Sequence, residues 1–131
     1  QIGYLPLSTD SALSGLYREN MVLYGGADED SFVEHYETAG STDLGDMCQL
    51  VPCMHVWASG ISGGLHSKDF KIEDYERAYV MLALTVIDLL YGDAGKAKEI
   101  MGAYRPKFTK ETYIKYMKEH SVVELFDGSA I

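Results

Sequence analysis

An apolar stripe in the second half of this 131-residue chain limits its fold more than any other feature of the sequence. Its members recur at steps of four, three, four and three residues, which is the spacing of one face of an α-helix. They are Tyr75, Tyr79, Leu82, Val86 and Leu89, and the stripe is widened by Ala78, Ala83 and Leu90. The pattern predicts a helix over about 73–91 that ends at Gly92, and its tyrosines are expected to pack in a core.

Three further helices are predicted from capping residues and apolar spacing. The first spans about 11–24 and has its N-cap within Ser8–Asp10. Two shorter helices are expected over about 94–103 and 110–119, and Thr109 is the expected N-cap of the second of these.

The strand signals are fewer and shorter. A loop over 27–39 is expected to hold a short strand near Phe32 and Val33, and the apolar run 53–57 is expected to form a buried strand after Pro52 ends a short helical turn. Strands that alternate with helices favour an α/β fold, here helix-rich and with few strands. Because a stable sheet needs about three strands or outside support, the chain is expected to expose strand edges and apolar surface and either to associate with further polypeptide or to self-associate.

The charge balance excludes several classes of partner. Twenty Asp and Glu residues against 11 Lys and Arg give a formal charge of −9, which repels phosphate backbones and anionic lipids. Neither nucleic acid nor a membrane surface is therefore expected as a partner. No apolar run reaches the roughly 18 residues that predict a membrane span, so the chain is expected to be soluble, and its length allows one domain at most.

The cysteine content points to a reducing environment. Cys48 and Cys53 are the two cysteines, too few for a disulfide scaffold. No basic residue lies next to either one to stabilise a thiolate, so buried, unreactive thiols are expected. A cytoplasmic location is the simpler expectation.

The segment GISGGLHS, residues 60–67, is the first candidate site. A neutral imidazole at His66 can bind zinc or act as a general base, and backbone N–H groups beside glycines can approach an anion such as a substrate carboxylate. The alternative is a glycine-rich surface turn with an incidental histidine. For a single histidine without a second ligand at a recognisable spacing, the residues alone favour this alternative.

The segment GSTDLGD, residues 40–46, is the second candidate. Asp43 and Asp46 lie where a short helix begins, and the unpaired N–H groups there favour negative charge. Plain capping by Ser41 or Thr42 accounts for the same residues and is favoured. A chemical role for the two carboxylates stays open.

The other histidines are expected to be structural or exposed. His55 alternates with apolar neighbours, which favours a hydrogen-bonded structural histidine over a metal ligand, and any further role stays open. His35 and His120 lie among charged residues and are expected to face solvent. The basic patch over 107–118 is expected to be a solvated helix face.

The candidate segments stand in a particular order along the chain. GSTDLGD is followed by Gln49, by Val51-Pro52 leading to His55, by GISGGLHS and by the Ala- and Leu-rich helix. This ordered set resembles the C-terminal part of metal-dependent amidohydrolases of the aminoacylase and carboxypeptidase G type. Within that superfamily it is most similar to the aminobenzoyl-glutamate utilisation protein B subgroup. The resemblance covers most of the chain, including residues 3–7 and 106–113.

The resemblance implies a two-domain enzyme, in which a zinc-binding α/β catalytic domain is interrupted by a smaller lid domain that mediates dimerisation. Residues 1–131 then correspond to the C-terminal portion of the catalytic domain, after the lid. The start at Gln1, without an initiator Met or a leader, also favours a fragment. The expected partners are the missing N-terminal part of the same protein, a second copy bound through the lid, and a small amide substrate.

The resemblance also implies a site. His66 would be the last metal ligand, and Gly63 and Gly64 would lie beside the substrate, while no catalytic residue is assigned in this chain. Two divalent ions, zinc or alternatively manganese, would activate a water that hydrolyses the amide bond of an acyl- or aroyl-amino acid. The family's other ligands and its glutamate pair lie upstream, and this chain has no His-x-Asp, Cys-x-His or Glu-Glu segment. Because a catalytic zinc needs about three protein ligands, the isolated chain is expected to be inactive and to bind zinc weakly.

A function of a different class competes with this interpretation. The chain can equally be a small acidic interaction module that docks on a partner through its apolar faces and has no catalytic activity. Self-capped helices and the acidic balance favour it. A soluble, compact monomer would speak for the module.

Overall fold

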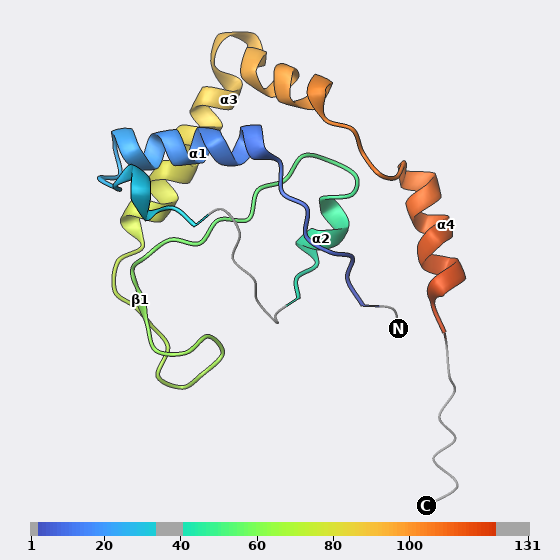
Figure 1. Cartoon of the computed structure of the whole chain (residues 1–131), viewed down its shortest axis with the longest axis horizontal. Coiled ribbons are helices and arrows are strands. Elements are labelled where there is room, and N and C mark those ends of the chain that lie inside the picture. Colours follow the sequence, from blue (N-terminus) through green and yellow to red (C-terminus); the bar gives the residue numbers. More distant parts are fainter. Residues whose placement is uncertain (1–2, 34–40, 123–131) are drawn as a thin grey trace, which may run out of the picture.

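The computed structural model of the chain describes residues 3–33 and 41–122 (Figure 1). Its elements, in chain order, are α1 (Ser11–Leu23), η1 (Glu29–Ser31), α2 (Leu44–Met47), β1 (Ile61–Ser62), β2 (Lys71–Ile72), α3 (Glu76–Ala103) and α4 (Lys110–His120). Within the described ranges, the two strands form a single antiparallel sheet. The prediction of a helix-rich chain with few strands is confirmed.

The predicted N-caps of α1 and α4 are confirmed. The Asp10 carboxylate accepts a hydrogen bond from the Leu13 N–H at 2.8 Å. At α4, the Thr109 hydroxyl oxygen accepts the Thr112 N–H at 3.2 Å, and the Thr112 hydroxyl oxygen accepts the Thr109 N–H at 2.8 Å. These bonds satisfy N–H groups that the first turn of a helix leaves unpaired.

α3 consists of two helical stretches joined at a sharp break. Tyr91, Gly92, Asp93 and Ala94 have non-helical backbone angles, and the last three have φ values of 58°, 62° and 58°. Glycine adopts this left-handed conformation without a steric penalty, which is why the break occurs at Gly92. The stretches on either side, 76–90 and 95–103, confirm the two helices predicted there.

By length and composition, α3 as a whole is the one helix in the described chain that is long and apolar enough to cross a membrane. Its longer straight part, 76–90, rises about 22 Å at about 1.5 Å per residue. The hydrocarbon core of a bilayer is roughly 30 Å thick. The absence of a membrane partner stays a prediction from the sequence.

The core lies where α1 crosses α3 (Figure 1). Tyr17 and Met21 of α1 are buried there against Met81 of α3. Five partly buried hydrophobic residues pack around these three: Ala27, Phe32, Met54, Val56 and Leu84. Full burial of one large apolar side chain contributes about 1.5–3 kcal/mol to folding, so this small cluster is the main apolar contribution that joins the two helices.

A polar contact beside this core selects the face of α3 that meets α1. The buried side-chain amide of Asn20 donates to Asp88 Oδ2 at 2.7 Å and to Thr85 Oγ1 at 3.3 Å. Thr85 is completely buried, and its hydroxyl donates to the Met81 carbonyl at 2.8 Å. Because a buried amide without partners is costly, these bonds favour one rotational setting of α3 against α1.

The expectation that the tyrosines of the α3 stripe pack in a core is wrong, and the stripe as a whole is largely exposed. Four of its five defining members are exposed: Tyr75, Tyr79, Leu82 and Val86. The adjacent face, which carries Thr85, packs on α1 instead. The physical reason is that α1 covers one side of α3, and the hydrogen bonds of Asn20 turn the Thr85 side toward it.

The strand predicted over 53–57 is also wrong. The segment runs without regular secondary structure and pairs with no strand within the described ranges. Met54 and Val56 pack toward the core, and the Cys53 carbonyl accepts the Asp10 N–H at 2.7 Å. Side chains of this segment therefore alternate toward the core as they do in a strand. A strand also requires a neighbouring segment that pairs with its backbone N–H and C=O groups.

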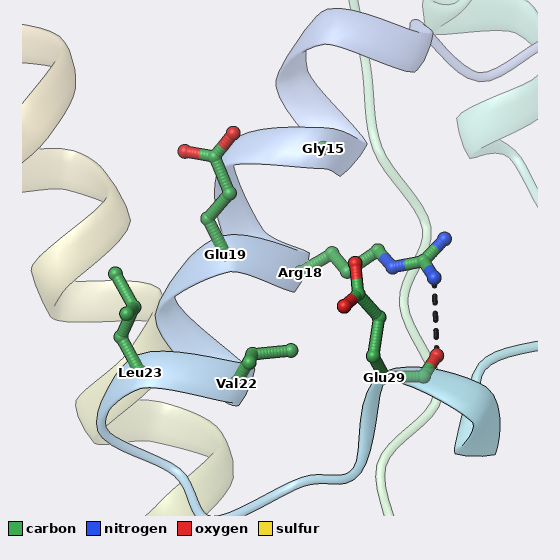
Figure 2. Close-up of a pocket in the computed structure, with 6 residues that line it drawn as sticks. All are labelled: Gly15, Arg18, Glu19, Val22, Leu23 and Glu29. Carbon is green, nitrogen blue, oxygen red and sulfur yellow. Dashed lines mark hydrogen bonds between the residues drawn. The ribbon is translucent and has the colours of Figure 1, made fainter.

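The loop predicted over 27–39 contains η1, and Phe32 and Val33 form no strand. Phe32 packs against the core, and the Arg18 guanidinium lies 4.8 Å above the centre of its ring. Figure 2 shows the same guanidinium donating to the Glu29 carbonyl, at 3.0 Å. Arg18 thus holds the end of this loop against α1. The part of the prediction from residue 34 on lies outside the described residues.

The residues after α2 connect the beginning and the end of the described chain. The Gln49 side chain is buried, and its Nε2 donates to the Pro6 carbonyl at 2.8 Å. The Gln49 carbonyl accepts the N–H groups of Lys107 and Phe108 at 3.0 and 3.2 Å. One residue therefore joins the segment before α1 to the segment before α4. α2 itself is the short helical turn predicted before Pro52.

Replacing Asn20 tests the contact between α1 and α3. Asn20→Ala removes the donor to Thr85 and Asp88, and we expect the free energy of unfolding to fall by about 1–3 kcal/mol. Urea denaturation followed by circular dichroism measures this change. Glu19→Ala, on the exposed side of the same helix, is the control and should change the free energy by less than about 0.5 kcal/mol. Equal losses in the two variants would contradict this role of Asn20.

Candidate functional site

The segment GISGGLHS forms the first half of a hairpin that projects from the pair of helices α1 and α3 (Figure 1). β1 and β2 pair antiparallel, with Ile61 opposite Ile72. The Gly60 carbonyl closes the base by accepting the N–H groups of Glu73 and Asp74 at 2.8 and 3.0 Å. The predicted Gly-rich turn is therefore an ordered hairpin with a closed base.

The backbone of this hairpin explains two of its glycines. Gly60 has a φ of 113°, and a Cβ placed on it would lie 1.9 Å from a main-chain carbonyl oxygen across the hairpin. Gly63 has a φ of 77°, and a Cβ there would lie 2.2 Å from another such oxygen. At Gly64 the nearest atom to a Cβ is the Ser67 hydroxyl oxygen, at 3.3 Å, on a side chain that can rotate. The fold therefore requires Gly60 and Gly63 but not Gly64.

Side-chain hydrogen bonds hold the turn. The Ser67 hydroxyl donates to the Gly64 carbonyl at 2.7 Å and also contacts the Asp69 carboxylate. The hydrogen bond from Ser67 lowers the pKa of the Asp69 carboxyl from its ordinary value. Near the base, the Ser62 hydroxyl donates to the Glu73 carboxylate at 2.6 Å. The hairpin thus has polar contacts at both ends.

His66 lies in this turn and is exposed. Its φ is 60°, in the left-handed region that non-glycine residues rarely adopt, although histidine does so more often than most. The surrounding turn holds this conformation, because the Ser67 N–H donates to the Gly64 carbonyl at 3.1 Å. The structure therefore places His66 in one exposed turn with Gly63 and Gly64, the glycines assigned to the substrate.

The described residues do not by themselves form a metal site. Within residues 3–33 and 41–122, no group of three or more His, Cys, Asp and Glu side chains is placed to hold a metal ion, so neither Asp43 nor Asp46 joins His66 in such a group. His66 can supply one imidazole, whereas a catalytic zinc takes about three protein ligands. In this part of the chain the donor set for a resident metal ion is incomplete.

The carboxylates of GSTDLGD take part in local structure. Asp46 accepts the Leu5 N–H at 2.9 Å. Burial, and then the Asp46 carboxylate, raise the pKa of Tyr113. At the start of α2, the Thr42 hydroxyl oxygen accepts a backbone N–H at 3.3 Å, whereas the Asp43 side chain makes no cap. The capping interpretation holds for Thr42, and Asp46 joins the N-terminal segment to α2.

The remaining histidines fall at separate places. His120 is exposed, as predicted, and its ring stacks on Tyr116 with the ring centres 4.1 Å apart. His55 meets the Trp57 ring edge-on at 5.5 Å, and the hydrogen bond expected for it is not found in the part of the chain that the structure describes. His35 lies outside the described residues. The lysines of the basic patch are exposed, which confirms a solvated helix face.

Cys48 and Cys53 are free and buried, as predicted. Burial, and then the neighbouring Cys48 thiol, raise the pKa of Cys53 to about 11. At neutral pH such a thiol is almost entirely protonated, and the thiolate is the reactive form. The Tyr104 hydroxyl donates to the Cys48 carbonyl, so the pair lies in a structural contact between α2 and the end of α3.

Arg77 is a functional candidate that the sequence patterns did not single out. It lies in the first turn of α3, and its guanidinium donates to Ser59 beside the base of the hairpin. The available signal was a single basic residue at the start of an apolar helical run.

The open hollow on α1, shown in Figure 2, is lined by side chains of both charges. The Arg18 guanidinium within it donates to the Glu29 carbonyl.

Comparisons with protein-family models, with curated proteins and with solved structures find no match to this chain. The resemblance to amidohydrolases therefore rests on the ordered segments GSTDLGD and GISGGLHS and the helix that follows them. Of the residues that it selects, the structure brings Gly63, Gly64 and His66 together in one hairpin.

Two glycine variants test whether the hairpin backbone requires glycine at position 63 but not at position 64. Gly63→Ala forces a Cβ against the opposite backbone and into an unfavourable φ, so we expect the hairpin to open and its amide protons to exchange with solvent about 10-fold faster or more. Gly64→Ala meets a movable hydroxyl and should leave exchange within about twofold of the parent chain. Hydrogen exchange measured by NMR decides this, and similar exchange in the two variants would contradict the geometry of the turn.

Proposed function

We propose that this chain is the C-terminal portion of the catalytic domain of a metal-dependent amidohydrolase of the aminoacylase and carboxypeptidase G type. The observation that carries the proposal is the exposed position of His66 in an ordered hairpin turn, in a left-handed backbone conformation that non-glycine residues rarely adopt. Its ring is free to join ligands supplied by another part of the same protein. The order of the motifs around it supports the same assignment.

The proposal requires that this chain is only part of a domain, and the exposed apolar face of α3 supports this. Tyr79, Leu82 and Val86 form an apolar strip at helical spacing, and Ile87 and Leu90 beside it are 56% and 62% exposed. Apolar surface of this extent on one helix is typical of a face that is covered in the functional protein. The sheet of the complete catalytic domain, supplied by the missing N-terminal part, is the proposed cover, because helices pack on the faces of parallel sheets.

In the complete enzyme, the proposed reaction is hydrolysis of the amide bond of an acyl- or aroyl-amino acid such as an aminobenzoyl-glutamate, in the cytoplasm, with zinc or manganese as the metal. The contribution of this chain is one imidazole at His66 and a hairpin backbone beside the substrate. Gly64 fits the second role, since its position leaves room that the fold itself does not require. Dimerisation would occur through the lid domain, outside this chain.

The test uses the longer protein that contains this chain. His66→Ala should lower bound zinc per subunit, measured by mass spectrometry of the metal, and reduce hydrolysis of aminobenzoyl-glutamate by about 100-fold or more, because even supporting residues of metal sites contribute about 10–100-fold. His120→Ala is the matched control, an exposed histidine on α4 that should retain metal and activity. Full metal content and activity in His66→Ala would refute the assignment.

The exposed α3 face also favours the second candidate function, an acidic interaction module without catalysis. Val86→Asp places a charge in the apolar strip, whereas Ile114→Asp places the same charge on a partly exposed position of α4. If the face binds the N-terminal part of the same protein, Val86→Asp should weaken that association about 10-fold or more and Ile114→Asp should not. Size-exclusion chromatography with light scattering, on the chain alone and mixed with that part, measures this association. A compact monomer that does not bind the N-terminal part would instead support the interaction module.

A further inference from the structure

The guanidinium of Arg77 joins three segments that are separate in the sequence. Arg77 is the second residue of α3 and is half-buried. Its Nη2 donates to the Ser59 hydroxyl oxygen, just before the hairpin, and its Nη1 donates at 3.4 Å to the Gly25 carbonyl, just after α1. One side chain therefore links the start of α3, the end of α1 and the approach to the hairpin.

These contacts lie beside the base of the hairpin. Gly60, next to Ser59, accepts the N–H groups of Glu73 and Asp74, which lie shortly before Arg77. These hydrogen bonds close the base of the hairpin. Arg77 connects the segment that enters the base, at Ser59, to α3 and to the end of α1. Beyond the base, the hairpin projects away from α1 and α3 (Figure 1). A rotation at the base would therefore be amplified at the turn that carries His66.

The planar guanidinium suits this role. It presents several N–H donors in a fixed fork, so bonding two acceptors at once defines a direction as well as a distance. A lysine at the same position could reach one acceptor or the other but would not fix the angle between them. The position of Arg77 within the first turn of α3 makes the helix the rigid support for this fork.

We propose that Arg77 is a positioning residue for His66: by holding Ser59 and Gly25 together, it orients the hairpin so that the imidazole meets the ligands supplied by the rest of the enzyme. This inference rests on the proposed function. The interactions that position a metal ligand typically contribute about 10–100-fold to metal affinity. Arg77 would act through the hairpin, without contact to the metal or to the substrate.

The first experiment uses the chain as it stands, without metal. Arg77→Met keeps the length of the side chain and removes both hydrogen bonds, and Ser59→Ala removes one of them without touching α1. We expect exchange of the Glu73 and Asp74 amide protons, followed by NMR, to become about 10- to 100-fold faster in Arg77→Met. Ser59→Ala should give part of this effect, and the double variant should be no faster than Arg77→Met, since the two residues share one bond.

Two controls separate positioning from general stability. Arg105→Met removes another arginine whose hydrogen bonds go to nearby carbonyls, and it should leave the hairpin amides unchanged. Amide exchange within α1 should change by less than about twofold in Arg77→Met, and Arg77→Lys should restore part of the protection of the hairpin. Unchanged exchange at the hairpin, or an equal acceleration throughout α1 and α3, would overturn the inference.

The second experiment uses the longer protein and zinc. Arg77→Met should weaken zinc binding about 10-fold, measured by competition with a chromogenic chelator, and Arg77→Lys should recover part of this loss. Unchanged zinc affinity in Arg77→Met would overturn the positioning role even if the hairpin loosens. If His66→Ala leaves zinc binding intact, the proposed function itself fails. That failure can be told apart from a failure of the Arg77 inference, because the exchange data come from the metal-free chain and do not depend on zinc.

Discussion

The packing of α1 on α3 is the constraint on which the rest of the structure depends. Tyr17, Met21 and Met81 supply its apolar part, and Asn20 supplies its direction by bonding to Thr85 and Asp88. A small apolar cluster alone would tolerate several rotations of one helix against the other, whereas a buried amide that must find partners tolerates few. Because the hairpin leads directly into α3, this setting also decides where the hairpin points.

A second polar contact joins the segment before α1 to the segment before α4. Gln49 bonds to the Pro6 carbonyl through its side chain and to the N–H groups of Lys107 and Phe108 through its own carbonyl. The described part of the chain thus relies on a few specific hydrogen bonds where a larger domain would rely on a continuous core. The apolar face of α3 lies outside this arrangement. Apolar surface of this extent is typical of a face that a partner or further polypeptide covers.

Local features were predicted correctly and long-range features were not. The caps at Asp10 and Thr109 and the break at Gly92 depend on neighbours within a few residues, so the sequence contains their cause. The pairing of segment 53–57 and the buried side of α3 depend on which other segments are present. At the candidate site, His66 and its glycines could be found from their order in the chain, whereas Arg77 acts through contacts with residues 18 and 52 positions away.

By itself, the sequence determined the helices, the location of their ends and the segment that carries His66. These follow from capping, periodicity and glycine content, which act over a few residues. Only the tertiary structure decided that the most apolar face of α3 is exposed, that the hairpin is closed at Gly60, and that Arg77 joins it to both helices. Each of these depends on the relative placement of distant segments, since α1 covers only one side of α3 and the hydrogen bonds of Asn20 favour the side that carries Thr85.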